Sequence, residues 1–165
     1  MALFGTGLLP RPLPKLPAVP PEIELETARL ALSAEQRAAI WKLGWGARGK
    51  VLDKIFRQGN LHDLSRTIDD FVDGVAISNK SVDLNAATYK DFRRLLSRVS
   101  QDLEKIEAYS GTAWGGDIIL GSQIEGRVLR LIIPKGSMTP IQLEAIKAAT
   151  RIARSKGLRL IVAEF

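Results

Sequence analysis

The stretch RVLRLIIPKGSMTPIQLEAIKAATRIARSKGLRLIVAEF, residues 127–165, decides the fold. Its beginning, RVLRLIIP at 127–134, is rich in branched apolar residues and predicts a strand that stops at its proline. The segment TPIQ at 139–142 predicts a helix start, because it offers a threonine N-cap, a proline at the first helical position and a capping-box glutamine. Gly157 ends this helix, and 158–165 is a last strand. Strand, helix and strand in this order predict two parallel strands joined by a right-handed crossover.

Upstream of this unit lie a hairpin and a long helix. Residues 67–73 and 75–84 are β-prone, and the Asp73-Gly74 pair between them favours a tight hairpin turn. Apolar residues then recur at helical spacing over 88–109 and predict an amphipathic helix. The segment Trp114-Gly115-Gly116 predicts a turn. Together the elements predict an α/β fold, with a mixed central sheet flanked by helices.

Two further helices are expected before the hairpin. The first begins at Ser33, which forms a capping box with Gln36. The second covers 47–58 and ends at Gly59, and Asp53 lies on the flank of its apolar face.

The N-terminal part of the chain is expected to be a tether. Residues 10–21 hold six of the eight prolines, which disfavour helix and sheet pairing and favour a stiff, extended spacer. We therefore expect a proline-rich linker or leader over 1–32 and a folded domain over 33–165, with its core at 46–165.

Composition restricts the chemistry. The 165 residues include 24 Lys and Arg against 18 Asp and Glu, a formal charge of +6 that favours polyanionic partners such as nucleic acid. There is no cysteine and one histidine, which excludes thiolate metal sites and paired imidazoles. Any hydrolysis must therefore use carboxylates, lysine and hydroxyl groups. No apolar run approaches the ~20 residues that span a bilayer, so we expect no membrane-spanning segment.

Phosphodiester cleavage without histidine or cysteine has a known solution. Carboxylates hold a divalent cation, and a nearby lysine orients water or stabilises the developing charge. The hairpin offers Asp69 on its first strand, and Ser78 and Lys80 on one face of its second strand, because strand side chains alternate. Asp53, on the preceding helix, could reach the same end of the sheet. Residue types alone leave a solvent-exposed hairpin as the commoner explanation.

The hairpin sequence IDDFVDGVAISNKSVDL, residues 68–84, resembles the active-site hairpin of tRNase toxin domains. Such domains form the C-termini of contact-dependent growth inhibition proteins and belong to the PD-(D/E)XK nuclease superfamily. That family has an Arg-Gly helix with an acidic residue five positions after the arginine, and RGKVLD at 48–53 matches this spacing. The similarity covers about 46–165 and continues at 114–116, 133–136 and 138–139.

This resemblance implies a PD-(D/E)XK endonuclease-like fold and a metal-dependent nuclease that cuts RNA, often tRNA, in competing bacteria. Asp53 and Asp69 would be metal ligands and catalytic residues, with Lys80 as the catalytic lysine and Ser78 in the superfamily's acidic position. Asp53 stands where the family usually has glutamate, so the metal could be held through water. The ion would be Mg²⁺ or Mn²⁺, with Zn²⁺ as a further candidate.

The resemblance also implies partners and a location. The domain would be delivered as part of a larger secreted or cell-surface protein, would act in the target cell's cytoplasm, and would be neutralised by a cognate immunity protein in the producing cell.

Candidate nucleic-acid contacts are Arg48, Lys90, Arg93, Arg94, Arg98, Trp114, Arg127 and Arg130.

Several alternatives stay open. A helix face rich in arginine is usually only solvated, and Trp114 either stacks on a flipped base or packs the turn. Asp70 is expected to face solvent, and His62 to lie on a surface loop. A DNase of the same superfamily and a non-enzymatic, basic nucleic-acid-binding module are the competing functions.

Overall fold

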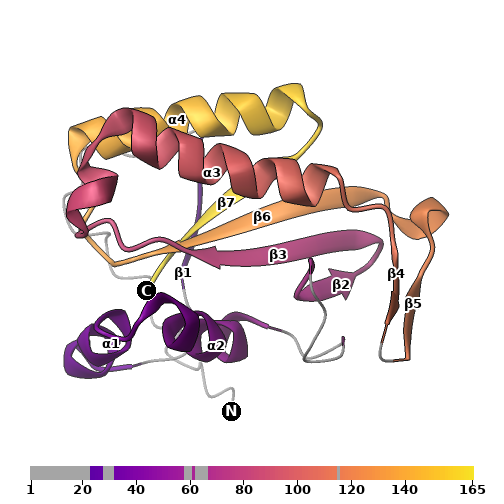
Figure 1. Cartoon of the computed structure of the whole chain (residues 1–165), viewed down its shortest axis with the longest axis horizontal. Helices are drawn as coiled ribbons and strands as arrows, with labels where there is room; N and C mark the ends of the chain where they lie inside the picture. Colours follow the sequence, from indigo (N-terminus) through magenta and orange to yellow (C-terminus); the bar gives the residue numbers. More distant parts are fainter. Residues whose placement is uncertain (1–22, 28–31, 58–60, 62–66, 115) are drawn as a thin grey trace, which may run out of the picture.

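The computed structural model describes residues 23–27, 32–57, 61, 67–114 and 116–165. Within these residues a five-stranded sheet has the order β1-β7-β6-β3-β2 (Figure 1). All neighbours are parallel except β2, which pairs antiparallel with β3. The expected mixed sheet is therefore confirmed. Its strands are β1 (Glu24–Thr27), β2 (Asp70–Val72), β3 (Val75–Ser81), β6 (Gly126–Ile133) and β7 (Arg159–Glu164).

Helices cover both faces of the sheet (Figure 1). On one face lie α3 (Phe92–Glu107) and α4 (Pro140–Ser155), and on the other α1 (Ala34–Trp41) and α2 (Trp45–Phe56). None of the helices in the described part of the chain is long and apolar enough to cross a membrane.

The two faces differ in the size of their cores. The larger core joins the sheet to α3 and α4, and its largest fully buried residues include Leu95, Leu103, Leu129, Leu131 and Ile146. The smaller core holds α2 against the sheet through Leu52, Phe56, Ile132, Ala163 and Phe165. Strand β6 supplies residues to both cores. Alternate side chains of a strand face opposite sides of the sheet, and a central parallel strand is buried on both sides.

The C-terminal unit forms as its sequence predicts. Strands β6 and β7 are parallel neighbours joined through α4. The side-chain oxygen of Thr139 accepts from the backbone N–H of Gln142 at 3.2 Å, and Gln142 Oε1 accepts from the backbone N–H of Thr139 at 2.9 Å. This capping box, with Pro140 at the first helical position, fixes the start of α4. Gly157, with φ of +69°, follows the helix in the left-handed conformation that glycine adopts without strain.

The expected hairpin is also present. Val72 pairs with Val75 across a two-residue turn, and Asp73 and Gly74 both have positive φ, as a tight hairpin turn requires. Its first strand is shorter than expected, since β2 begins at Asp70.

Four further features differ from the sequence-based expectations. Asp91 caps α3 by accepting from the N–H of Arg94 at 2.9 Å, so residues 87–90 form a separate 3-10 turn and Lys90 is not part of the long helix. Helix α2 ends at Phe56, and Gly59 lies outside the described residues.

The other two differences concern strands. Around the expected turn at 114–116, strands β4 (Thr112–Trp114) and β5 (Asp117–Ile119) form a second hairpin. Strand β1 joins the sheet beside β7, so the sheet includes residues from the segment 1–32 that was expected to be a linker.

Candidate active site

A groove of about 1100 Å³ runs between α2, the C-terminal half of β3 and α3. Because β2 pairs only with residues 75–77, the remainder of β3 forms a sheet edge that opens into this groove. Asp53, Asn79, Lys80 and Ser81 are among the residues that line it. The short length of β2 thus exposes the part of β3 on which the sequence placed its candidate lysine.

Asp69 is held in place by three hydrogen bonds just before β2. Its backbone N–H donates to the carbonyl of Ile77 at 2.8 Å, and its own carbonyl accepts from Arg57 Nε at 2.9 Å. Its side-chain Oδ2 accepts from the backbone N–H of Asn79 at 2.6 Å. Burial raises the pKa of Asp69, while the Asn79 hydrogen bond and the charges of Lys80 and Arg57 oppose that rise. The carboxylate is therefore fixed in position in a partly desolvated environment.

Asp53 approaches Asp69 from α2. Burial is the main cause that raises the pKa of Asp53 to about 6, and the negative charge of Asp69 adds to the rise. The positive charges of Lys80 and Arg57 lower it. The charges of Asp69 and Lys80 both act on the Asp53 carboxyl, so α2 and the hairpin place these three groups near one another.

Ser78 and Asp70 are placed differently from the candidates that line the groove. Ser78 is 2% exposed and lies inside the sheet opposite Leu129, which leaves its hydroxyl little access to the groove. Asp70 was expected to face solvent, and this is wrong: it is fully buried as the first residue of β2. Strand β2 begins at Asp70, so Asp69 lies just before the strand. Because successive side chains of a strand face opposite sides, Asp70 is buried and Asp69 is left at the end of the strand.

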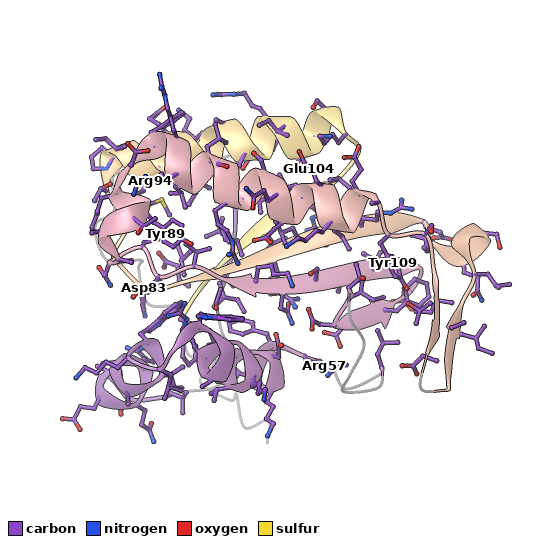
Figure 2. The ribbon with its side chains drawn as sticks, in the orientation of Figure 1. Arg57, Asp83, Tyr89, Arg94, Glu104 and Tyr109 are labelled. Atoms are coloured by element: carbon purple, nitrogen blue, oxygen red, sulfur yellow. The ribbon has the colours of Figure 1, made fainter. Side chains whose placement is uncertain are left out.

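Arg57 and Asn79 contribute to the site although the sequence did not single them out. Arg57 follows α2 and donates to the carbonyls of Asp69 and Leu61; Figure 2 shows it beyond the end of α2, on the side where β2 lies. Asn79 is buried, and its Oδ1 accepts from Arg130 at 3.0 Å. Arg130 is 6% exposed and therefore belongs to the interior rather than to a nucleic-acid surface. No pattern of residue types signals Arg57, because the partners described above are backbone carbonyls.

The donor set is compatible with a hard divalent cation. Asp53 and Asp69 are two neighbouring carboxylates whose burial disfavours their charged forms, a cost that a cation would offset. Mg²⁺ and similar ions are bound in proteins through one or two carboxylates and keep several waters. No cluster of three or more His, Cys, Asp or Glu with metal-binding geometry occurs in the described ranges, so protein atoms there offer a partial coordination shell. The residues fit an ion completed by water and substrate oxygens.

The expected nucleic-acid contacts separate into three groups. Arg48 lines the groove, where its Nε donates to Ser81 Oγ at 3.4 Å. Arg93 and Arg94 line a second, shallower groove of about 530 Å³ on α3, which shares Arg98 and Tyr89 with the first.

The third group is placed elsewhere or not described. Arg127 lies outside both grooves and donates to the carbonyl of Tyr109 at 3.0 Å. Lys90 is exposed at the end of the 3-10 turn. The backbone of Trp114 ends β4, but its side chain and all of His62 lie outside the described part of the structure.

Comparison with known proteins adds the family. A family model described as "CDI toxin restriction endonuclease-like domain" matches residues 48–163. The chain belongs to this family. It is thus a nuclease-type toxin domain of contact-dependent growth inhibition, and the predicted membership of such a toxin family is confirmed. The matched region contains Asp53, Asp69 and Lys80.

A solved structure shares the fold of this CDI toxin domain. A chain of the "CdiA-CT/CdiI toxin and immunity complex from Yersinia pseudotuberculosis" has a TM-score of 0.58 and 20% sequence identity, over 74% of this chain and 99% of that one. No curated protein matches the sequence.

Proposed function

We propose that this CDI toxin domain is a divalent-metal-dependent endonuclease that hydrolyses phosphodiester bonds at Asp53, Asp69 and Lys80. The observation that carries the proposal is that Asp53 and Lys80 line a wide groove and that Asp69, a second partly desolvated carboxylate, lies close enough for its charge to act on Asp53. Removal of a carboxylate from water costs free energy, and carboxylates with perturbed pKa values in a cleft are typical of functional sites.

Each residue has a role that its position supports. Asp53 and Asp69 would hold the cation, which when bound neutralises phosphate charge and makes a water molecule more acidic. Lys80 would donate to a phosphate oxygen and stabilise the negative charge that develops there. Arg57 and the N–H of Asn79 keep Asp69 oriented through its carbonyl and its Oδ2. Ser78 would act only as a small residue that lets β3 pack, since it is buried.

Transfer RNA in a competing cell is the substrate that the resemblance favours. The domain would be delivered by a larger secreted or surface protein and would act in the target cytoplasm. The positive residues of the groove suit a folded polyanion, because phosphate contacts supply affinity without requiring a particular sequence.

DNA is the second candidate, and the family description itself favours it, since restriction endonuclease-like proteins are named after enzymes that cut DNA. Metal-assisted attack by water does not use the 2′-hydroxyl that distinguishes RNA. Nothing in the chemistry of Asp53, Asp69 and Lys80 therefore selects RNA over DNA.

A cognate immunity protein is the partner we propose. The structural neighbour belongs to a toxin and immunity complex, and a cell that makes a nuclease must inhibit it.

The test is to incubate the purified chain with total tRNA and with plasmid DNA side by side, with Mg²⁺, Mn²⁺ or Zn²⁺, and to resolve the products on gels. We expect cleavage of one substrate that Lys80→Ala abolishes, whereas a non-enzymatic binding module would show no cleavage. Asp73→Asn, a change of an exposed turn carboxylate, is the matched control and should cut normally.

A further inference from the structure

Trp45 is the most exposed large apolar residue among those described, with 85% of its surface accessible. It is the first residue of α2 and lines the same groove as Asp53 and Lys80. A single exposed apolar side chain is ordinary on a protein surface, so its surroundings must decide whether it has a role.

The neighbouring tryptophan, Trp41, serves the fold. Its indole N–H donates to the carbonyl of Phe165 at 2.9 Å, and the guanidinium of Arg48 lies 5.2 Å from the centre of its ring. Arg48 in turn donates to Ser81 on β3. Trp45, four residues later and the first residue of α2, lines the groove and is exposed instead of being packed in the core.

The charge of the groove suits a nucleic acid. Its cationic lining residues are Lys42, Arg48, Lys50, Lys80, Arg98 and Lys105. Its three carboxylates are Asp53, Asp83 and Asp102. Asp102 is already paired with Arg98 at 3.0 Å and Lys105 at 3.8 Å, and Asp53 is at the proposed metal site. An exposed aromatic ring beside a cationic groove is the arrangement by which proteins stack unpaired bases while they follow the backbone.

Two glycines leave the surface of α2 bare along this groove. Gly46 lies in the first turn of the helix, and Gly49 lies inside it, where glycine costs up to about 1 kcal/mol relative to alanine. A Cβ at either position would meet no atom within 4 Å, so internal packing does not explain them. Glycine also permits close approach of a ligand to the backbone. Trp45, Gly49 and Asp53 are spaced four residues apart and therefore lie along one side of the helix.

We infer that Trp45 and the glycine-lined side of α2 form a subsite for an unpaired nucleobase, an inference that rests on the proposed nuclease function. The base stacks on the indole while the chain passes over Gly49 towards Asp53. Along the helix axis the backbone positions of Trp45 and Asp53 are separated by about 12 Å, from a rise of 1.5 Å per residue. At ~3.4 Å per stacked nucleotide the base lies roughly three nucleotides from the cut bond. The substrate is thus a single-stranded or locally opened nucleic acid.

The experiment measures binding, so that it does not depend on cleavage. Single-stranded 15-nucleotide RNA and DNA probes with 2-aminopurine at successive positions, and their duplex forms, are titrated in EDTA with wild type, Trp45→Ala and Trp45→Phe. Trp45→Ala should weaken single-strand binding about tenfold and abolish 2-aminopurine quenching, as expected for one lost stack. Trp45→Phe should keep most of both. Duplex affinity should change less than about twofold, because backbone charge dominates there.

Two further variants complete the test. Ile141→Ala removes another exposed apolar side chain, on α4 at the opposite face of the sheet, and should bind all probes normally. Gly49→Leu, which favours the helix, should weaken single-strand binding by obstructing the path. Comparison of the RNA and DNA probes shows which of the two nucleic acids supplies the stacked base.

Several results would overturn the inference. Unchanged single-strand binding by Trp45→Ala would show that Trp45 does not stack a base. An equal loss for duplex and single-stranded probes would show a general electrostatic or folding effect. Normal binding by Gly49→Leu would show that the chain takes another path. Absence of cleavage of any nucleic acid would contradict the proposed function but leave these binding results interpretable.

Discussion

Replacement of Asp53 by asparagine should stabilise the metal-free protein while it abolishes cleavage. The pKa of Asp53 is raised to about 6 from 3.8, chiefly by burial. The carboxyl therefore favours folding most when it is protonated: this contribution is complete below about pH 3.8 and is lost as the pH rises through 6. Asparagine has nearly the same shape and cannot ionise, so it avoids this loss.

The size of the effect follows from the shift. About two pKa units correspond to about 3 kcal/mol at 1.36 kcal/mol per unit. Asp53 is only half-buried, and solvent screening reduces the value to about 1–2 kcal/mol. For a domain of this size that is an increase in Tm of about 3–6 °C.

The assay is thermal unfolding in EDTA at pH 7.5 and at pH 4. Asp53→Asn should unfold at a higher temperature than wild type at pH 7.5, and the two should converge at pH 4. Excess Mg²⁺ should raise the Tm of wild type but not that of the variant, because the ion stabilises only a state that binds it. Asp73→Asn, in the exposed turn, should match wild type in every condition. An Asp53→Asn variant equal to or less stable than wild type at pH 7.5 would refute the assignment of burial as the cause.

Four other outcomes are expected. Asp69→Ala and Lys80→Ala should each reduce the cleavage rate at least about a hundredfold with far-UV circular dichroism unchanged; near-normal rates would remove that residue from the mechanism. EDTA should stop cleavage and added Mg²⁺ or Mn²⁺ restore it, and full activity in excess chelator would contradict the carboxylate–metal site. Asp91→Ala should lower the free energy of unfolding by about 1 kcal/mol through loss of the α3 cap, measured by urea denaturation. The immunity protein should associate more slowly as salt rises; a rate independent of salt would exclude charge-assisted capture by the basic groove.

Local sequence signals predicted much of this fold. The capping box at Thr139 and the turn at Asp73-Gly74 involve neighbouring residues, so their geometry depends little on the rest of the chain. The short strand β1 was not predicted, because its pairing with β7 joins residues far apart in the sequence and its own four residues carry little pattern.

The candidate site was predictable in part for the same reason. Asp69 and Lys80 belong to one hairpin, and their resemblance to a known motif indicated a common site. The burial of Asp70 was missed, because a difference of one residue in the start of β2 exchanges the inner and outer faces. Arg57 was missed because its partner is a backbone carbonyl, which leaves no trace in residue type.

The smaller core affects the order in which contacts can form while the chain is being synthesised. Helix α2 carries Asp53, and it is held to the sheet by Phe165, whose ring lies 6.1 Å from that of Phe56 and whose carbonyl accepts from Trp41. Strand β7 and Phe165 follow every residue of the proposed site in the chain. The ring contact between Phe56 and Phe165 therefore forms only after the ribosome has added these late residues. Until then the nascent chain has its carboxylates and lysine but lacks part of the smaller core that holds α2, the helix that carries Asp53.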